Sequence, residues 1–242
     1  MHGERKSCRR HHGFERPWCT KQILVVLNFL ISFICAVLCI CTIGFHDEMT
    51  LSWTIGILCV IVGLMILFSI VLALYVYVSM ADTFPEANLI PGAKELRCLK
   101  CDLIVNKRIK HCHICQKCTE GFDHHCLYLN TCIGKKNIVP FRWLIGMSIL
   151  YLLAQETLAF ITVLSTRSST IRSIIIAFLI PPCIGLLGLI VLGSFQYYIY
   201  RSGMTTYEFA VHLARQKQKP KEYIEISIAQ NIKLITRDEP IQ

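Results

Sequence analysis

Four long apolar stretches alternate with polar segments along the 242-residue chain. They run from about Ile23 to Ile43, Leu51 to Val78, Trp143 to Leu164 and Ile174 to Tyr200. Each reaches the roughly 20 residues that an α-helix needs to cross about 30 Å of hydrocarbon. None contains Lys or Arg, and Glu156 is the one acid within them. The pattern predicts an all-α polytopic membrane protein with four transmembrane helices, in which Glu156 faces other helices or a cavity and not lipid.

The polar segments between these stretches differ in positive charge. Six Lys and Arg residues precede the first stretch, nine lie in the segment 79–141 and seven follow Tyr200, whereas the loop 44–50 has none. Arg167 and Arg172, near the loop after the third stretch, run mildly against this trend. An excess of Lys and Arg marks cytosolic loops. We therefore expect both termini and the middle segment in the cytosol, and we attribute the net charge of +9 to this topology and not to nucleic-acid binding.

The same pattern predicts five parts in the chain. They are a cytosolic N-terminal segment (1–22), a first pair of transmembrane helices (23–78), a cytosolic cysteine-rich zinc domain (79–141), a second pair of helices (142–200) and a cytosolic tail (201–242). The middle domain is too short and too polar to bury much of a core, so it needs cross-links or metal to fold. The N-terminus has no apolar run ending in a small-residue cleavage site, so we expect no cleaved signal peptide.

Seven of the fourteen cysteines lie between Cys98 and Cys132, mixed with four histidines. Two thiolates in a Cys-x2-Cys turn can share one tetrahedral zinc ion, and the reducing cytosol favours metal ligands over disulfides. Two such ions need eight ligands, and the segment offers eleven. Counting leaves two possibilities open. All seven cysteines and one histidine bind zinc, which makes the domain purely structural, or one cysteine stays free.

Cys126 is the best candidate for a free cysteine, because it follows Asp123, His124 and His125 directly. A nearby imidazole lowers the pKa of a thiol and makes it a thiolate nucleophile. An acid beside the imidazole can orient it and stabilise its charged form. If one cysteine stays free, Cys126, His124 and Asp123 therefore supply a nucleophile, a base and an acid that can orient the base, all within four residues.

Over residues 98–137 the cysteine and histidine spacing resembles that of the DHHC protein S-acyltransferases, C-x2-C-x9-H-C-x2-C-x2-C-x4-D-H-H-C-x5-C-x4-N. That family also has two membrane spans on either side of this module. It carries a Thr-Thr-x-Glu motif after the last span, which is Thr205-Thr206-Tyr207-Glu208 here. Two positions depart from the family pattern. Leu127-Tyr128 replaces Pro-Trp, and Asp82-Thr83-Phe84-Pro85 is at most a degenerate form of an Asp-Pro-Gly motif.

The resemblance implies a protein-cysteine S-palmitoyltransferase that works by ping-pong thioester exchange. A long-chain acyl group would pass from acyl-CoA to Cys126, and then to cysteines of membrane-associated substrate proteins. The resemblance also implies two structural zinc ions, one on Cys98, Cys101, His111 and Cys118 and the other on Cys112, Cys115, His125 and Cys132. It makes the endoplasmic reticulum or the Golgi the expected location.

Coenzyme A carries phosphates, so basic residues near the module are candidates for binding it. They include Arg108, Lys135 and Lys136. The resemblance implies that the acyl chain lies among the helices, where the bulk and position of Tyr151 make it a candidate for limiting chain length.

Two other functions fit parts of the pattern. A membrane adaptor with a structural zinc module and little catalysis is the main alternative, and the two departures at 127–128 and 82–85 support it. A RING-type ubiquitin ligase would also use two zinc ions, but the chain lacks the RING spacing. An adaptor has no need of a free thiol beside a base, so the presence of Asp123, His124 and Cys126 together favours the acyltransferase.

Overall fold

The computed structural model describes residues 9–44, 51–85 and 96–218. Four helices dominate it: α1 (Thr20–Gly44), α2 (Leu51–Met80), α3 (Ile138–Ser165) and α4 (Ser169–Arg201). All four are long and apolar enough to cross a membrane. The predicted fold class is therefore confirmed. α3 begins at Ile138 and not at Trp143, because the helix continues past Arg142 into four further residues. α4 begins at Ser169 and not at Ile174, because a helical backbone can continue into polar residues beyond the hydrocarbon.

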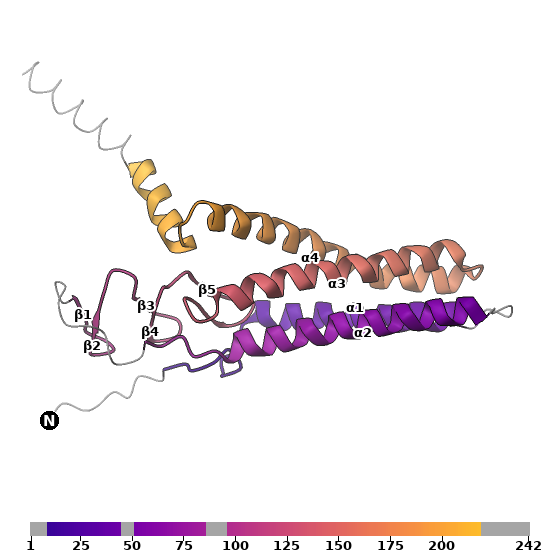
Figure 1. The fold of residues 1–242 in the computed structure, drawn as a ribbon, viewed down its shortest axis with the longest axis horizontal. Coiled ribbons are helices and arrows are strands. Elements are labelled where there is room, and N and C mark those ends of the chain that lie inside the picture. Colours follow the sequence, from indigo (N-terminus) through magenta and orange to yellow (C-terminus); the bar gives the residue numbers. More distant parts are fainter. Residues whose placement is uncertain (1–8, 45–50, 86–95, 219–242) are drawn as a thin grey trace, which may run out of the picture. The chain divides into compact units, whose positions relative to one another are not determined.

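Helix α3 is central to the bundle because it packs against both α1 and α2, and the three run side by side (Figure 1). Leu64 and Val71 of α2 meet Leu144 and Leu152 of α3 in the main core. Glu156 of α3 accepts a hydrogen bond from the Cys183 thiol of α4 at 3.1 Å. The acid therefore faces a neighbouring helix, as predicted.

Three short antiparallel hairpins lie between α2 and α3, at one end of the helices (Figure 1). They pair β1 (Leu96–Cys98) with β2 (Leu103–Val105), β3 (Lys110–Cys112) with β4 (Lys117–Thr119), and β5 (His124–Cys126) with β6 (Thr131–Ile133). Hairpins this small are marginal in water without further support. The cysteine-rich region predicted between the second and third helices is therefore present, and the strands alone do not account for its stability.

Residues 199–218 belong to a second compact unit, which is described here by itself. A helix over residues 206–218 follows Thr205. The Thr205 amide donates to the Glu208 carboxylate at 2.8 Å, and the Glu208 amide donates to the Thr205 hydroxyl at 3.1 Å. This reciprocal pair is a capping box. The Thr-Thr-x-Glu motif thus begins a helix, and residues 219–242 of the predicted tail lie outside the described residues.

Candidate functional site

The hairpins bring together two sets of four metal-ligating side chains. In each set the potential ligand atoms all lie within 4.8 Å of one another. The first set contains Cys98, Cys101, His111 and Cys118, and the second contains Cys112, Cys115, His125 and Cys132. These are the two groupings that the family resemblance implied. Six of the seven module cysteines fall into the two sets.

Both sets have the dimensions of a tetrahedral zinc site. Zinc–sulfur and zinc–nitrogen distances of about 2.3 and 2.0 Å place sulfur and nitrogen ligands roughly 3.5 Å apart. The Nδ1 atom of His111 lies 3.6, 3.3 and 4.0 Å from the sulfurs of Cys98, Cys101 and Cys118. The corresponding distances from His125 Nδ1 to the sulfurs of the second set are 3.7, 3.3 and 3.9 Å. Each set therefore fits one metal ion with four protein ligands.

Backbone pairing explains how each set assembles. His111 lies opposite Cys118 in the β3–β4 hairpin, and His125 lies opposite Cys132 in the β5–β6 hairpin. The Cys-x2-Cys pairs occupy the turns of the first two hairpins, where Asp102 and Gln116 take positive φ angles of 54° and 50°. The first set thus joins hairpins one and two, and the second set joins hairpins two and three. The middle hairpin is held at both ends by ligands.

Cys126 is the one cysteine between Cys98 and Cys132 that lies outside both sets. It is 5% exposed and belongs to the core cluster that includes Val78 and Phe141. The neighbouring His124 ring meets the Phe141 ring edge-on, with the ring centroids 5.4 Å apart. The nucleophile predicted from the sequence is therefore a thiol held at the end of the helix bundle, where the module packs on α2 and α3.

Asp123 and His124 form a hydrogen bond between Oδ2 and Nδ1 at 2.7 Å, and the Asp123 side chain is 3% exposed. Burial lowers the pKa of His124, but its hydrogen bonds with Asp123 and Cys126 outweigh burial and raise that pKa to about 9. The His124 imidazole thus lies between the Cys126 thiol and the Asp123 carboxylate and is hydrogen-bonded to both. This arrangement can stabilise a thiolate beside an imidazolium.

Asn137 anchors this site to the helices. Its fully buried side chain accepts a hydrogen bond from the Gly134 amide at 2.9 Å. It donates to the carbonyl groups of Cys132 and Val78 at 3.1 and 3.4 Å. The end of α2, the second metal-ligating set and the start of α3 therefore meet at one amide side chain.

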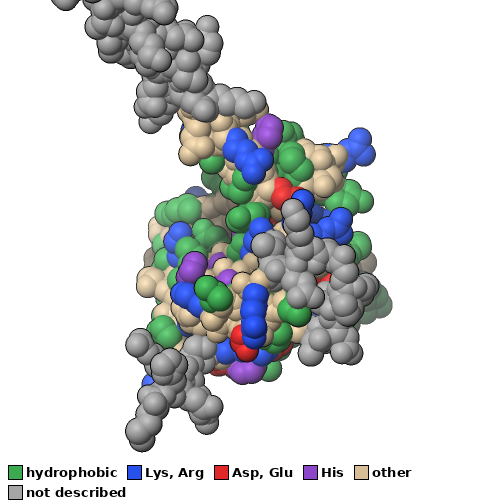
Figure 2. Space-filling view, turned by 90° about the vertical axis from the view of Figure 1, so that its left-hand side faces the viewer, with side chains coloured by type: hydrophobic (Ala, Val, Ile, Leu, Met, Phe, Trp, Pro, Cys, Tyr) green, Lys and Arg blue, Asp and Glu red, His purple; other side chains and the backbone are tan. Residues whose placement is uncertain are grey.

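The structure distributes the predicted acyl-CoA residues over two regions. Arg108, Lys135 and Lys136 are exposed on the module, where Lys and Arg side chains are visible near histidines (Figure 2). Lys135 also forms an ion pair with Glu120 at 2.7 Å. Tyr151 lies inside the helix bundle and is 1% exposed. The basic side chains and the buried tyrosine therefore lie on different parts of the molecule.

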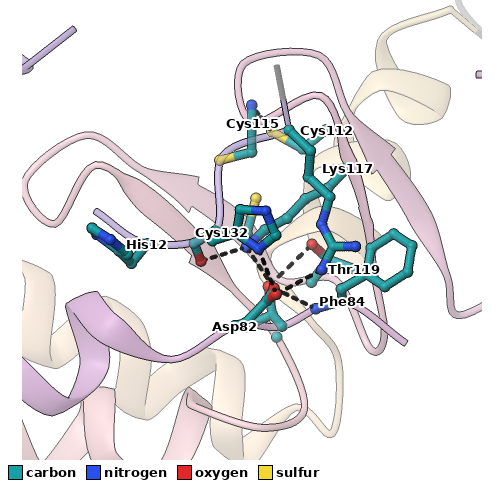
Figure 3. Close-up of polar contacts among 12 residues, drawn as sticks. His12, Asp82, Phe84, Cys112, Cys115, Lys117, Thr119 and Cys132 are labelled. Carbon is teal, nitrogen blue, oxygen red and sulfur yellow. Dashed lines mark hydrogen bonds and ion pairs between the residues drawn. The ribbon is translucent and has the colours of Figure 1, made fainter. Parts of the chain in front are cut away.

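A cluster around Asp82 was not foreseen as functional from the sequence. Lys117, whose side chain is fully buried, donates to Asp82 at 3.0 Å, and Arg9 donates to the other carboxylate oxygen at 2.6 Å. The Phe84 amide donates to the same Asp82 oxygen as Lys117, at 3.1 Å, and Figure 3 shows these residues together with the cysteines of the second set. Burial raises the pKa of Asp82, but the Lys117 hydrogen bond, the Phe84 amide and the Arg9 charge hold it at about 2. The segment that resembles a degenerate Asp-Pro-Gly motif thus ties α2 to the module.

Fold and site together define a class: a polytopic membrane protein whose Cys/His module can hold two metal ions and presents an acid–imidazole–thiol group to the end of a helix bundle. The family model described as DHHC palmitoyltransferase matches residues 93–212. The chain belongs to the DHHC palmitoyltransferase family.

Several curated proteins are similar to parts of the chain. A probable protein S-acyltransferase 20 of Arabidopsis thaliana is 31% identical over 144 residues, which cover 52% of this chain and 20% of that protein. The palmitoyltransferase ZDHHC4 of Rattus norvegicus is 37% identical over 87 residues, or 36% of this chain and 21% of the relative. The palmitoyltransferase erf2 of Schizosaccharomyces pombe is 52% identical over 40 residues, which cover 16% of this chain and 11% of that protein. The matched segments thus span about a fifth or less of these relatives.

Proposed function

We propose that the protein is a protein-cysteine S-palmitoyltransferase, which transfers a long-chain acyl group from acyl-CoA to cysteines of membrane-associated proteins through a thioester on Cys126. The observation that carries the proposal is the position of Cys126. It lies outside both metal-ligating sets and next to His124, which is hydrogen-bonded to the buried Asp123. The family and the names of the similar proteins support the same reaction class.

The first step would load the enzyme. The Cys126 thiolate attacks the thioester carbonyl of acyl-CoA, so that a carbon–sulfur bond to Cys126 forms while the bond to coenzyme A sulfur breaks. The imidazolium of His124 can give its proton to the departing thiolate. Asp123 keeps the His124 ring in place and stabilises its charged form.

The second step would transfer the acyl group. A cysteine of the substrate protein gives its proton to His124 and attacks the acyl carbonyl, and Cys126 leaves as a thiolate. One thioester replaces another in both steps, so the reaction requires no nucleotide hydrolysis.

The two metal ions would have a structural role in this reaction. The three cysteines and one histidine of each set would hold a zinc ion with four protein ligands, so no position would remain for substrate. The residues of the second set also fix the catalytic strand, because His125 lies between His124 and Cys126. The metal-ligating side chains would therefore position the strand that carries Cys126, and residues 123, 124 and 126 would carry out the acyl transfer.

The membrane setting suits a lipid substrate. Each buried CH₂ favours an apolar medium by about 0.8 kcal/mol, so the acyl chain stays in the bilayer or among the helices while its thioester reaches the surface. Cys126 lies at the end of the bundle, in the core shared by the module and α2 and α3. The charge asymmetry of the loops supports a cytosolic module, where acyl-CoA and substrate cysteines would be available.

Incubation of the purified full-length protein with radiolabelled palmitoyl-CoA tests the proposal. We expect a hydroxylamine-sensitive label on the wild type and none on Cys126→Ser, with two zinc ions per chain in both, because Cys126 is not in either ligand set. Cys59→Ser is the matched control, since this thiol is exposed on α2 and lies outside the module. Label on Cys59→Ser should equal that of the wild type.

Two results would reject the proposal. An unlabelled wild type would favour the adaptor with a structural metal module. Loss of zinc in Cys126→Ser would show that Cys126 is itself a ligand.

A further inference from the structure

Residues 9–18, which precede α1, form a strap across the module and the end of α2. The Gly13 amide donates to the Ser79 carbonyl at 2.7 Å, and the Arg10 amide donates to the Cys115 carbonyl at 3.0 Å. The strap therefore connects the end of α2 with the second metal-ligating set. Its residues lie far from both partners in sequence, so these contacts are tertiary and not local.

The strap also holds the turn that follows Cys126. Residues 127–130 connect Cys126 to Thr131, its partner in the β5–β6 hairpin. Asn130 closes this turn with a positive φ of 53°, and it is 3% exposed. Its side-chain amide donates to the carbonyls of Gly13 and Pro17, both at 3.1 Å, and its side-chain oxygen accepts a hydrogen bond from Arg10. All of these partners of the Asn130 side chain belong to the strap.

Arg10 makes most of the hydrogen bonds between its guanidinium, the strap and Asn130. It is 8% exposed, and its guanidinium also donates to the carbonyls of Pro17 and Asn130 at 3.2 and 3.4 Å. Each of these acceptors is an uncharged oxygen. Burying a cation is costly unless its hydrogen bonds are well formed, so the guanidinium holds these three oxygens in a narrow geometry.

The backbone of the strap lies close to the same turn. A Cβ atom at Gly13 would collide with the carbonyl oxygen of Leu129. Leu129 is 3% exposed and belongs to the same core cluster as Cys126. A displacement of the strap would therefore move two residues of the turn, Leu129 through direct contact and Asn130 through hydrogen bonds.

We propose that Arg10 is a positioning residue for the nucleophile: by holding Asn130, it fixes the turn 127–130 and thereby the place of the Cys126 thiol relative to His124. This inference rests on the proposed acyltransferase function and extends its site to a segment before the first helix. Arg10 would not touch the acyl-CoA. Its loss would therefore lower the rate of the chemical step and leave the binding of acyl-CoA unchanged.

The test compares full-length wild type, Arg10→Ala, Arg10→Lys and Arg16→Ala. Arg16 is the matched control, because it is an exposed arginine of the same strap and its removal changes the charge equally. Three quantities are measured: zinc per chain, the KM and maximum rate of Cys126 acylation by palmitoyl-CoA, and the rate at which iodoacetamide alkylates Cys126, read by peptide mass spectrometry. The alkylation needs no acyl-CoA.

We expect Arg10→Ala to retain two zinc ions and to lower the maximum rate about tenfold or more, with KM within about twofold of the wild type. Alkylation of Cys126 should be several-fold faster, because the thiol loses its cover. Arg10→Lys should recover part of the rate, since its ammonium can still donate to Asn130. Arg16→Ala should match the wild type. Gly13→Ala, which changes no charge, should lower the rate as Arg10→Ala does.

Three outcomes would overturn the inference. They are an unchanged maximum rate in Arg10→Ala, a rise in KM alone, and loss of zinc, which would make the strap a support of the metal sets. If the wild type itself is not acylated, the proposed function fails. The alkylation rates then still decide the role of Arg10, and equal rates in wild type and Arg10→Ala would reject it.

Discussion

At the scale of single residues, Tyr151 has the best-defined surroundings of the proposed substrate contacts. Its ring stacks with Phe29 of α1, at a centroid distance of 6.1 Å, and meets Phe68 of α2 at 5.7 Å. Ser32 of α1 donates to its hydroxyl at 3.5 Å. The side chain thus fills the space among three helices. If an acyl chain enters the bundle from the end that carries Cys126, the Tyr151 ring would block its further extension.

Tyr151→Ala should therefore shift the acyl-chain preference toward longer chains. Two additional methylene groups would find room where the ring stood, and burial of each is worth about 0.8 kcal/mol, so the preference for stearoyl-CoA over palmitoyl-CoA should rise about tenfold. Competition between the two labelled acyl-CoAs on the purified enzyme measures this ratio. Tyr77→Ala is the control, since Tyr77 is 56% exposed on α2. An unchanged ratio in Tyr151→Ala would remove Tyr151 from the substrate site.

The sequence could suggest a role for residues whose chemistry depends on neighbours in sequence, and it gave no signal for those whose partners are distant. Asp123, His124 and Cys126 were recognisable because a carboxylate, an imidazole and a thiol occur within four residues. The two ligand sets came from the resemblance to a family, since counting could not choose among eleven candidates. Arg10 had no distinguishing signal. It is one of several arginines in a basic segment, and its partner Asn130 lies 120 positions away.

At the scale of elements, the Asp82 cluster joins α2 to the β3–β4 hairpin, and its charge explains how it should respond to pH. The pKa of Asp82 is about 2, below the value of 3.8 for a free side chain. A lowered pKa means that the ionised carboxylate stabilises the folded state. This contribution is complete above about pH 4 and is lost as the pH falls toward 2. Between pH 6 and 8 it should be constant.

Asp82→Asn should consequently lower the melting temperature by about 4 °C or more, and by the same amount at pH 6 and pH 8. The reason is that the fully buried Lys117 would lose its anionic partner. Thermal unfolding of the full-length protein in detergent, with zinc present throughout, measures the difference. Asp102→Asn is the control, because its ion pair with Arg97 is exposed on both sides and should contribute little. A difference that grows with pH would contradict this account of Asp82.

The elements themselves were predictable to different degrees. The four helices follow from apolar stretches long enough to cross a bilayer, although α3 begins before Arg142, which interrupts its apolar run, and α4 begins in the more polar residues 169–173. The six strands have three residues each, too few to show an alternating pattern. In the second and third hairpins the pairing places two ligands of one set opposite each other, His111 with Cys118 and His125 with Cys132. The pairing of these short strands therefore follows from the spacing of the Cys and His residues better than from any strand pattern.

At the scale of the whole molecule, the two ligand sets should contribute unequally to catalysis. The second set includes His125 of the β5–β6 hairpin, which also carries Cys126, whereas the first set lies on the two hairpins that precede it. Cys112 and Cys118 offer a matched comparison. Both are buried cysteines on the β3–β4 hairpin, and each belongs to a different set.

We expect Cys112→Ser and Cys118→Ser each to hold one zinc ion fewer than the wild type. Cys112→Ser should lower the rate of Cys126 acylation about a hundredfold, because His125 loses its metal and no longer fixes the strand between His124 and Cys126. Cys118→Ser should keep the rate within about tenfold of the wild type, since the catalytic hairpin retains its ion. Measuring zinc per chain and the rate of Cys126 acylation on the same samples tests whether the two sets contribute unequally. Equal losses of rate would mean that the module folds as one cooperative unit, in which the first ion supports Cys126 through the middle hairpin as strongly as the second supports it directly.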